Sequence, residues 1–249
     1  MKSIQISLTP AAGKQLIALA LAQNKKVMKA AREHTLVIVA GTTNTYVAKT
    51  VLEAIGENGF TGKHFFRGIV SGQPVPSDLP EMDGDVVIEK GQWIHGKTIQ
   101  EVAPDLKVGD MILKGANAVD LRTGDAAVLI GHPMGGTLAA IAQAAMGRRV
   151  GVMVPVGVEK RVEGPISELC YLCNDPEASG VRLAQAPGKA YTEIDAIAEL
   201  TGAAAHLIAS GGVCGYEGIA WFQCTGTEEQ IAKLQQVMKQ VKDTPAYHY

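Results

Sequence analysis

Short apolar runs alternate along the chain with stretches in which apolar residues recur at helical spacing. The apolar runs predict strands, at residues 36–40, 85–89, 108–120 (ending in a turn of small residues), 126–130 and 150–154. The other stretches predict a long first helix from Pro10 to about Arg32, a second that ends at Gly56 and a third that ends at Gly147. This alternation is typical of an α/β fold, here a Rossmann-like, mainly parallel sheet with helices on both faces.

Between the second predicted helix and the next strand, residues 57–80 are rich in Gly and Pro, and a loop is predicted at 73–78. After about residue 155 the pattern changes, beginning with a charged run at residues 159–163 that we expect to be exposed. The later part predicts a second unit with strands and capped helices, at residues 181–185, 192–202, 203–209, 217–224 and from Thr227 onward. This order is most of a ferredoxin-like α+β unit. We therefore predict two domains, at residues 1–155 and 156–249.

Two glycine-rich turns are the best candidates for a ligand site, because each joins a predicted strand to a predicted helix. The first contains Gly41, Thr42, Thr43, Asn44 and Thr45, and the second, at residues 131–137, contains Gly135, Gly136 and Thr137. Free backbone N–H groups and the positive end of a helix dipole favour an anion there. An ordinary capped helix start has the same composition, so the first turn alone leaves both interpretations open. In a parallel sheet both turns would meet at the carboxyl ends of the strands.

Four further residues near these turns are candidates for chemistry. Asp120 is a candidate base, because a carboxylate in a cleft can be tuned toward neutral pH, and it is equally well explained as a turn cap. His132 is a candidate acid or base, although a single loop histidine is more often structural. Lys114 and Asn117 would contact the anion, unless the lysine is simply solvated. Neither turn has the spacing of a dinucleotide or nucleotide-phosphate loop, which excludes those classes.

Composition narrows the class of protein. A chain of 249 residues that is 47% hydrophobic and 19% charged predicts a globular protein with a large core. A net charge of −2 and only 5% aromatic residues predict neither nucleic acid nor an anionic membrane as a partner. The first residues lack the apolar core of a signal peptide, and no apolar run is long enough to span a bilayer. We therefore expect a cytoplasmic protein.

The four cysteines predict neither a disulfide framework nor a metal site. Cys170 and Cys173 form a CxxC pair, but nine residues separate Cys214 from Cys224, whereas a zinc knuckle needs two. The CxxC also lacks the strand-to-helix setting of a redox pair. We expect buried, unpaired cysteines and neither metal nor cofactor.

On these motifs the chain resembles the superfamily of ribose-5-phosphate isomerase type A, glucosamine-6-phosphate deaminase and the CoA transferases. Residues 40–45 are similar to its phosphate turn, and residues 114–120 are similar to its Asp-Gly-Ala-Asp-Glu-hydrophobic-Asp strand end. Residues 131–137 fall where the isomerase has a run of lysine and glycine, and residues 193–231 are similar to its small α+β domain. The resemblance implies this fold and a phosphate-binding turn.

The same segments depart from the isomerase at its catalytic positions. Lys114 and Asn117 stand where the isomerase has aspartates, no lysine occupies residues 131–136, and residues 138–140 lack its glutamate. For a CoA transferase, Glu57 and Glu89 are only loosely placed candidates for the reacting glutamate. The resemblance therefore implies the fold without the pentose-phosphate isomerase activity.

Three hypotheses remain open from the sequence. The first is a protein that binds a small anionic, phosphorylated metabolite between the two turns and catalyses proton transfer, isomerisation or hydrolysis through Asp120 or His132. The second is a catalytically silent sensor or assembly subunit that retains the binding site. The third is a transferase or hydrolase that uses a CoA ester. In each case we expect a homo-oligomer.

Overall fold

The computed structural model describes residues 1–68, 76, 78–79 and 82–248, so most of the predicted loop at 73–78 lies outside the described residues. The elements follow in the order β1 (Lys2–Leu8), α1 (Pro10–Leu21), α2 (Lys25–Glu33), β2 (Thr35–Ile38), α3 (Thr42–Ile55), β3 (Val86–Glu89), β4 (Gln92–Ile94), α4 (Ile99–Val102), β5 (Met111–Leu113), β6 (Ala118–Asp120), β7 (Asp125–Ile130), α5 (Gly136–Ala142), β8 (Gly151–Pro155), α6 (Ile166–Cys173), β9 (Arg182–Tyr191), α7 (Glu193–Thr201), β10 (Ala204–Ser210), β11 (Ala220–Gly226) and α8 (Glu228–Val241). A π-helical turn, Gln143–Gly147, extends α5, and a 3-10 turn, Val158–Lys160, follows β8. No helix in the described part of the chain has the length and apolar character needed to cross a membrane.

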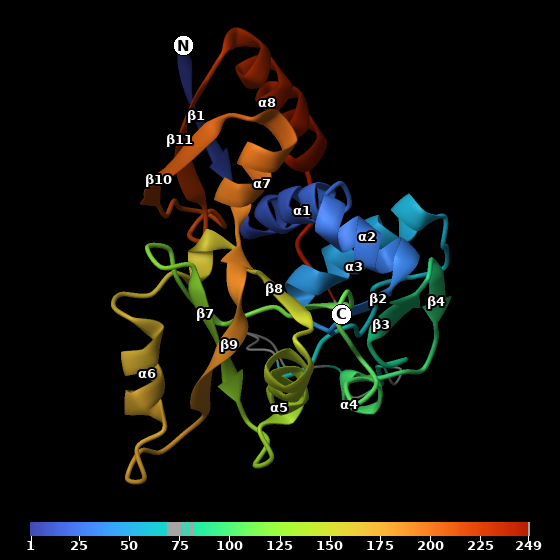
Figure 1. The fold of residues 1–249 in the computed structure, drawn as a ribbon. Coiled ribbons are helices and arrows are strands. Elements are labelled where there is room, and N and C mark those ends of the chain that lie inside the picture. Colours follow the sequence, from blue (N-terminus) through green and yellow to red (C-terminus); the bar gives the residue numbers. More distant parts are fainter. Residues whose placement is uncertain (69–75, 77, 80–81, 249) are drawn as a thin grey trace.

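The strands form two sheets (Figure 1). The larger has eight strands in the order β4-β3-β2-β5-β8-β9-β7-β6, and the smaller is antiparallel with the order β1-β11-β10. In the large sheet β2, β5, β8 and β9 are parallel, whereas β3 and β7 run antiparallel to their inner neighbours. The predicted mixture of helices and strands is confirmed, with the correction that the large sheet is mixed and is parallel only at its centre.

Helices cover both faces of the large sheet because alternate strand residues point to opposite sides. Leu36 and Ile38 of β2 pack into the cluster that contains α1, α2 and α3. Val37, between them, packs with Ile99 of α4 and Ile141 of α5. The anchoring of α3 and α5 to opposite faces positions the two glycine-rich turns that precede them.

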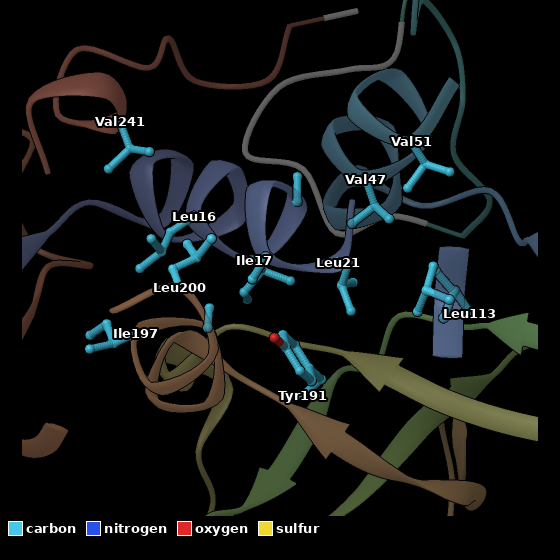
Figure 2. Packing of buried hydrophobic residues seen from close by; sticks show 14 of the residues in the cluster. Leu16, Ile17, Leu21, Val47, Val51, Leu113, Tyr191, Ile197, Leu200 and Val241 are labelled. Atoms are coloured by element: carbon cyan, nitrogen blue, oxygen red, sulfur yellow. The ribbon is translucent and has the colours of Figure 1, made fainter. Parts of the chain in front are cut away.

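Helix α1 packs against elements of both sheets. Its residues Leu16, Ile17 and Leu21 are fully buried. In Figure 2 they lie between α3 and the pair α7 and α8, with Leu200 of α7 beside Leu16. One continuous core therefore joins the large sheet to the small one.

The predicted division at residue 155 does not separate the two sheets. Strand β1 precedes it in the chain but pairs with β11 in the small sheet. Strand β9 follows it but pairs with β8 and β7 in the large sheet. In Figure 1 the small sheet lies at the top with α7 and α8, while α6 lies beside β7 and β9.

Two predicted elements are each divided in the structure. The long first helix is interrupted after α1, because the side chain of Asn24 accepts hydrogen bonds from the N–H groups of Lys26 (3.0 Å) and Val27 (3.1 Å) and starts α2. The strand predicted at 108–120 becomes β5 and β6, which lie at different positions in the large sheet. The segment between them carries the chain past β8, β9 and β7.

Candidate functional site

Both glycine-rich turns line one cavity of about 1100 Å³. From the predicted set it is lined by Gly41, Thr42, Thr43, Lys114, Asn117, His132, Gly135, Gly136 and Thr137. The remaining predicted site residues, Asn44, Thr45 and Asp120, do not line it. The two turns, far apart in the sequence, thus belong to the same site.

The turns do not meet in the way that the sequence predicted. The first follows β2, one of the parallel strands, and lies at its carboxyl end. The second follows β7, which runs antiparallel to β9, so it leaves the sheet at the opposite end. The expectation that both turns share the carboxyl edge of parallel strands is therefore wrong. The cavity instead extends from the first turn, at the carboxyl end of β2, to the second turn, at the end of β7.

The first turn presents an uncapped helix start to the cavity. No side chain caps α3 at Gly41, which leaves the first N–H groups of the helix available. Thr43 is only 2% exposed, and its hydroxyl has no hydrogen-bond partner among the described residues. A buried hydroxyl without a partner costs free energy unless a bound group supplies one. This end of α3 is thus arranged to receive hydrogen-bond acceptors.

The next two residues of this turn stabilise the fold. Asn44 is fully buried, and its Nδ2 donates to the carbonyl oxygens of Val39 (2.7 Å) and Leu113 (3.0 Å). It therefore ties the start of α3 to the ends of β2 and β5. The hydroxyl of Thr45 is within hydrogen-bond distance of the Gly41 carbonyl oxygen (3.1 Å).

Four cationic side chains line the cavity: Lys14, Arg67, Lys114 and Lys160. They come from α1, the segment after α3, the end of β5 and the turn after β8. None of the described residues that line the cavity is an Asp or a Glu. All charged side chains in the described lining of the cavity are therefore cationic.

Burial lowers the pKa of all three lysines in this group. The pKa of Lys114 falls to about 8, because of burial and then of the nearby Lys160, against a smaller opposing effect of Asp85. The pKa of Lys14 is lowered by burial and by Lys160, and that of Lys160 by burial. The Nζ of Lys160 donates to the carbonyl oxygen of Ala116 (2.8 Å), and that of Lys114 to its neighbour Gly115 (3.2 Å).

A buried carboxyl lies behind two of the lysines. Glu193, the first residue of α7, accepts a hydrogen bond from the N–H of Val158 (2.9 Å). Its burial and the neighbouring Glu159 raise the pKa of the Glu193 carboxyl. A Cβ at residue 13 would lie 2.3 Å from Oε1 of Glu193, so any larger residue than Gly13 would displace this carboxyl. The carboxyls of Glu193 and Glu159 oppose the lowering of the Lys14 pKa.

Arg67 is held at the cavity by a buried carboxylate. Asp85 pairs with Arg67 and accepts hydrogen bonds from the N–H groups of Ala40 (2.8 Å) and Ile99 (2.7 Å). Asp85 therefore also fixes Ala40, the residue before the first turn. A carboxylate with these partners is satisfied and orients the guanidinium.

The two predicted catalytic residues lie in different surroundings. Asp120 is buried outside the cavity lining, and its Oδ1 accepts a hydrogen bond from the N–H of Arg122 (2.9 Å), as expected of a turn cap. His132 is exposed at the cavity, and its Nδ1 accepts from the N–H of Met134 (3.1 Å). The neutral ring then carries its proton on Nε2, which is left for a ligand.

The segment after α8 also reaches the cavity. The hydroxyl of Tyr46 in α3 donates to the carbonyl oxygen of Pro245 (2.9 Å). The ring of Tyr247 lies edge-on to that of Phe66, with 6.0 Å between centroids, and Tyr247 and His248 line the cavity. Figure 1 accordingly places this end of the chain near the middle of the molecule.

The cysteines lie away from this site and are unpaired. Only Cys224 is buried; Cys170 and Cys173 are half-buried on α6, and Cys214 is exposed, which corrects the expectation that all four are buried. Among the described residues no group of three or more His, Cys, Asp or Glu is arranged to hold a metal ion.

Sequence reasoning missed three of the four cations. Lys14 has a visible signal, because it is the one charged residue in the largely apolar α1. Lys160 belongs to the charged run predicted as exposed, yet it and Glu159 are half-buried, whereas Arg161 and Glu163 are exposed. Arg67 is recognisable only through its pairing with Asp85, which is a tertiary contact.

Neither the protein-family models nor the curated proteins nor the solved structures compared with this chain match it. The functional interpretation therefore stands on the geometry of the site.

Proposed function

We propose that the cavity binds a small anionic, phosphorylated metabolite. The observation that carries this proposal is the combination, at one cavity, of the uncapped start of α3, the unpartnered Thr43 hydroxyl and four cationic side chains. Helix N–H groups and a hydroxyl donate to phosphate oxygens, and ammonium and guanidinium groups offset their charge. No carboxylate among the described lining residues opposes an anion.

The volume of the cavity supports a ligand larger than phosphate itself. Pockets for small metabolites and cofactors are typically about 300–1,000 Å³, and this one is about 1100 Å³. The phosphate would lie at Thr43 and the uncapped start of α3, and the remainder of the ligand would extend past Lys114 toward Gly135 and His132.

We also propose that the chain has the fold of the superfamily that it resembles, that of the isomerase, the deaminase and the CoA transferases. The parallel strands β2, β5, β8 and β9 with helices on both faces support a Rossmann-like description of the sheet centre. Strands β1, β10 and β11 with α7 and α8 support a ferredoxin-like description of the small unit.

A second candidate, binding without the predicted acid–base chemistry, is favoured by the position of Asp120. Of the two proposed catalytic residues, only His132 lines the cavity. Among the described lining residues there is also no glutamate to react with a CoA ester.

Isothermal titration calorimetry with inorganic phosphate and with ribose 5-phosphate tests the proposal. Thr43→Val removes the hydroxyl and keeps the shape, and Lys114→Met removes the charge. Each should weaken binding at least about tenfold, since a hydrogen bond to a charged group contributes about 1.5–3 kcal/mol. Lys29→Met removes the same charge on the exposed face of α2 and should leave binding unchanged. Absence of binding by both probes, or equal weakening by all three variants, would refute the proposal.

A further inference from the structure

Lys114 differs from the other lysines of the cavity in its surroundings. It directly follows β5, and Leu113 pairs with Ile38 of β2, so Lys114 and the first glycine-rich turn leave the sheet side by side. Its Nζ contacts the carbonyl oxygen of Gly115, and no described carboxylate lies within ion-pair distance. An amine without a carboxylate partner is placed next to the proposed phosphate site.

The groups that face Lys114 disfavour its charged form. Lys160 and Arg67 are cations that lower its pKa, and Asp85, which acts in the opposite direction, is already paired with Arg67. Together with burial, they bring the pKa of the Lys114 amine to about 8. At pH 7 such a lysine carries on the order of a hundred times more neutral amine than one that titrates at 10.5. Burial and neighbouring cations are the known means of activating a lysine nucleophile.

We propose that Lys114 forms an imine with the carbonyl carbon of a phosphorylated aldehyde or ketone bound in the cavity. The neutral Nζ attacks the carbonyl carbon, and a proton moves from nitrogen to the oxygen to give a carbinolamine. The hydroxyl then leaves as water together with the remaining proton of that nitrogen, and the nitrogen lone pair forms the C=N bond. The step consumes no oxidant or reductant. The inference rests on the proposed anion site, because the phosphate holds the carbonyl beside Lys114.

Lys160 and Lys14 are the internal comparison. The Nζ of Lys160 is held by the Ala116 carbonyl oxygen at 2.8 Å, and Glu159 and Glu193 favour its charged form. Glu159 and Glu193 act in the same way on Lys14. The acid that opposes the lowered pKa of Lys114 is Asp85, which is paired with Arg67. Among the three lysines, Lys114 is therefore the one best suited to react.

Reductive trapping tests this inference. The protein is incubated at pH 7 with limiting glyceraldehyde 3-phosphate and cyanoborohydride, and the modified lysines are mapped by peptide mass spectrometry. The adduct should lie on Lys114, at least about tenfold above any other lysine, given the excess of neutral amine. It should fall severalfold with glyceraldehyde, which lacks the phosphate, or with competing inorganic phosphate. Lys114→Arg should bind phosphate and form no adduct above the level of surface lysines.

The outcomes separate the two proposals. Phosphate binding by calorimetry without an adduct on Lys114 overturns the imine and leaves the anion site standing. An adduct on Lys14 or Lys160 in place of Lys114, or equal labelling by glyceraldehyde, also overturns it. Absence of both phosphate binding and adduct refutes the anion site itself.

Discussion

The turn at residues 41–45 is built into the core, whereas the turn at residues 131–137 lies at the surface. In the first, Thr43 and Asn44 are buried, and Asn44 bonds to the ends of two strands. In the second, His132 is exposed and Met134 is 77% exposed. Both turns combine glycine with threonine at the start of a helix. The comparison indicates that the first turn is fixed in position, as the proposed anion site requires, whereas the second forms a more exposed wall of the cavity.

The largest expected difference concerns Asn44. Asn44→Ala removes both of its hydrogen bonds; the Leu113 carbonyl oxygen keeps the N–H of Val39 (2.9 Å) as a donor, whereas the Val39 carbonyl oxygen loses its side-chain donor. Each lost buried hydrogen bond costs about 1–3 kcal/mol, so the free energy of unfolding should fall by about 2–4 kcal/mol in urea titrations. Asn117→Ala is the control, because this exposed residue only accepts from the N–H of Leu129 (3.0 Å). Equal losses in the two variants would contradict the conclusion that Asn44 holds the first turn to the core.

Substitution of glycine by alanine should destabilise the protein at the second turn and not at the first. Gly135 has φ +77°, and a Cβ there would lie 3.1 Å from the Cβ of Ala139. Gly135→Ala should therefore cost about 1–2 kcal/mol of unfolding free energy, the usual penalty of the left-handed region. Gly41 has an extended backbone, and an added Cβ has only the Val39 carbonyl oxygen nearby, at 4.0 Å. The Gly41→Ala variant should be as stable as the wild type in thermal denaturation but should bind phosphate more weakly. A loss of unfolding free energy as large as that of Gly135→Ala would contradict this difference between the two turns.

The pH dependence of anion binding tests whether the positive charge of Lys114, beside the first turn, attracts the anion. The pKa of Lys114 is about 8, so the charged form that attracts an anion is present below that pH and is lost as the pH rises above it. Sulfate is a suitable probe because its own charge does not change there. Its affinity should fall by up to about tenfold per pH unit above 8, measured by calorimetry. In Lys114→Arg the decrease in sulfate affinity should be much smaller. If this variant shows the same pH dependence as the wild type, the decrease is caused by groups other than Lys114.

The smallest effect is expected at His132. The side chain is exposed, and it accepts one hydrogen bond from the backbone of its own turn. His132→Ala should change the unfolding free energy by less than about 0.5 kcal/mol. Phosphate affinity should change by less than about threefold if the fixed turn holds the phosphate. A loss comparable to that of Thr43→Val would mean that the second turn holds it instead.

Local signals were read correctly from the sequence. The capping boxes at Thr192 and Thr227 start α7 and α8 as predicted, and Gly56 ends α3 in the left-handed conformation. The lining by Gly41 and Gly135 also follows the prediction, since each lies in a strand-to-helix turn. These features depend on residues a few positions apart, which a sequence displays directly.

Features that depend on distant partners were missed. Ile4, Ile6 and Leu8 alternate as in a strand, but β1 pairs with β11 near the other end of the chain. Lys160 reads as part of an exposed charged run because Ala116 and Glu193, which surround it, come from other elements. The direction of β7, and so the true position of the second turn, likewise depends on its pairing with β9.

Lys14 gives the small sheet a share in the cavity. This lysine belongs to α1, whose apolar side is fixed against α7 and α8 through Leu16 and Ile17, and Glu193 of α7 stands behind it. Removing the small sheet together with α7 and α8 would expose that side of α1 and release the lysine from its position. The unit formed by these strands and helices therefore supports the wall of the cavity that carries Lys14, and we expect a shortened protein without it to lose the proposed anion affinity although every lining residue is retained.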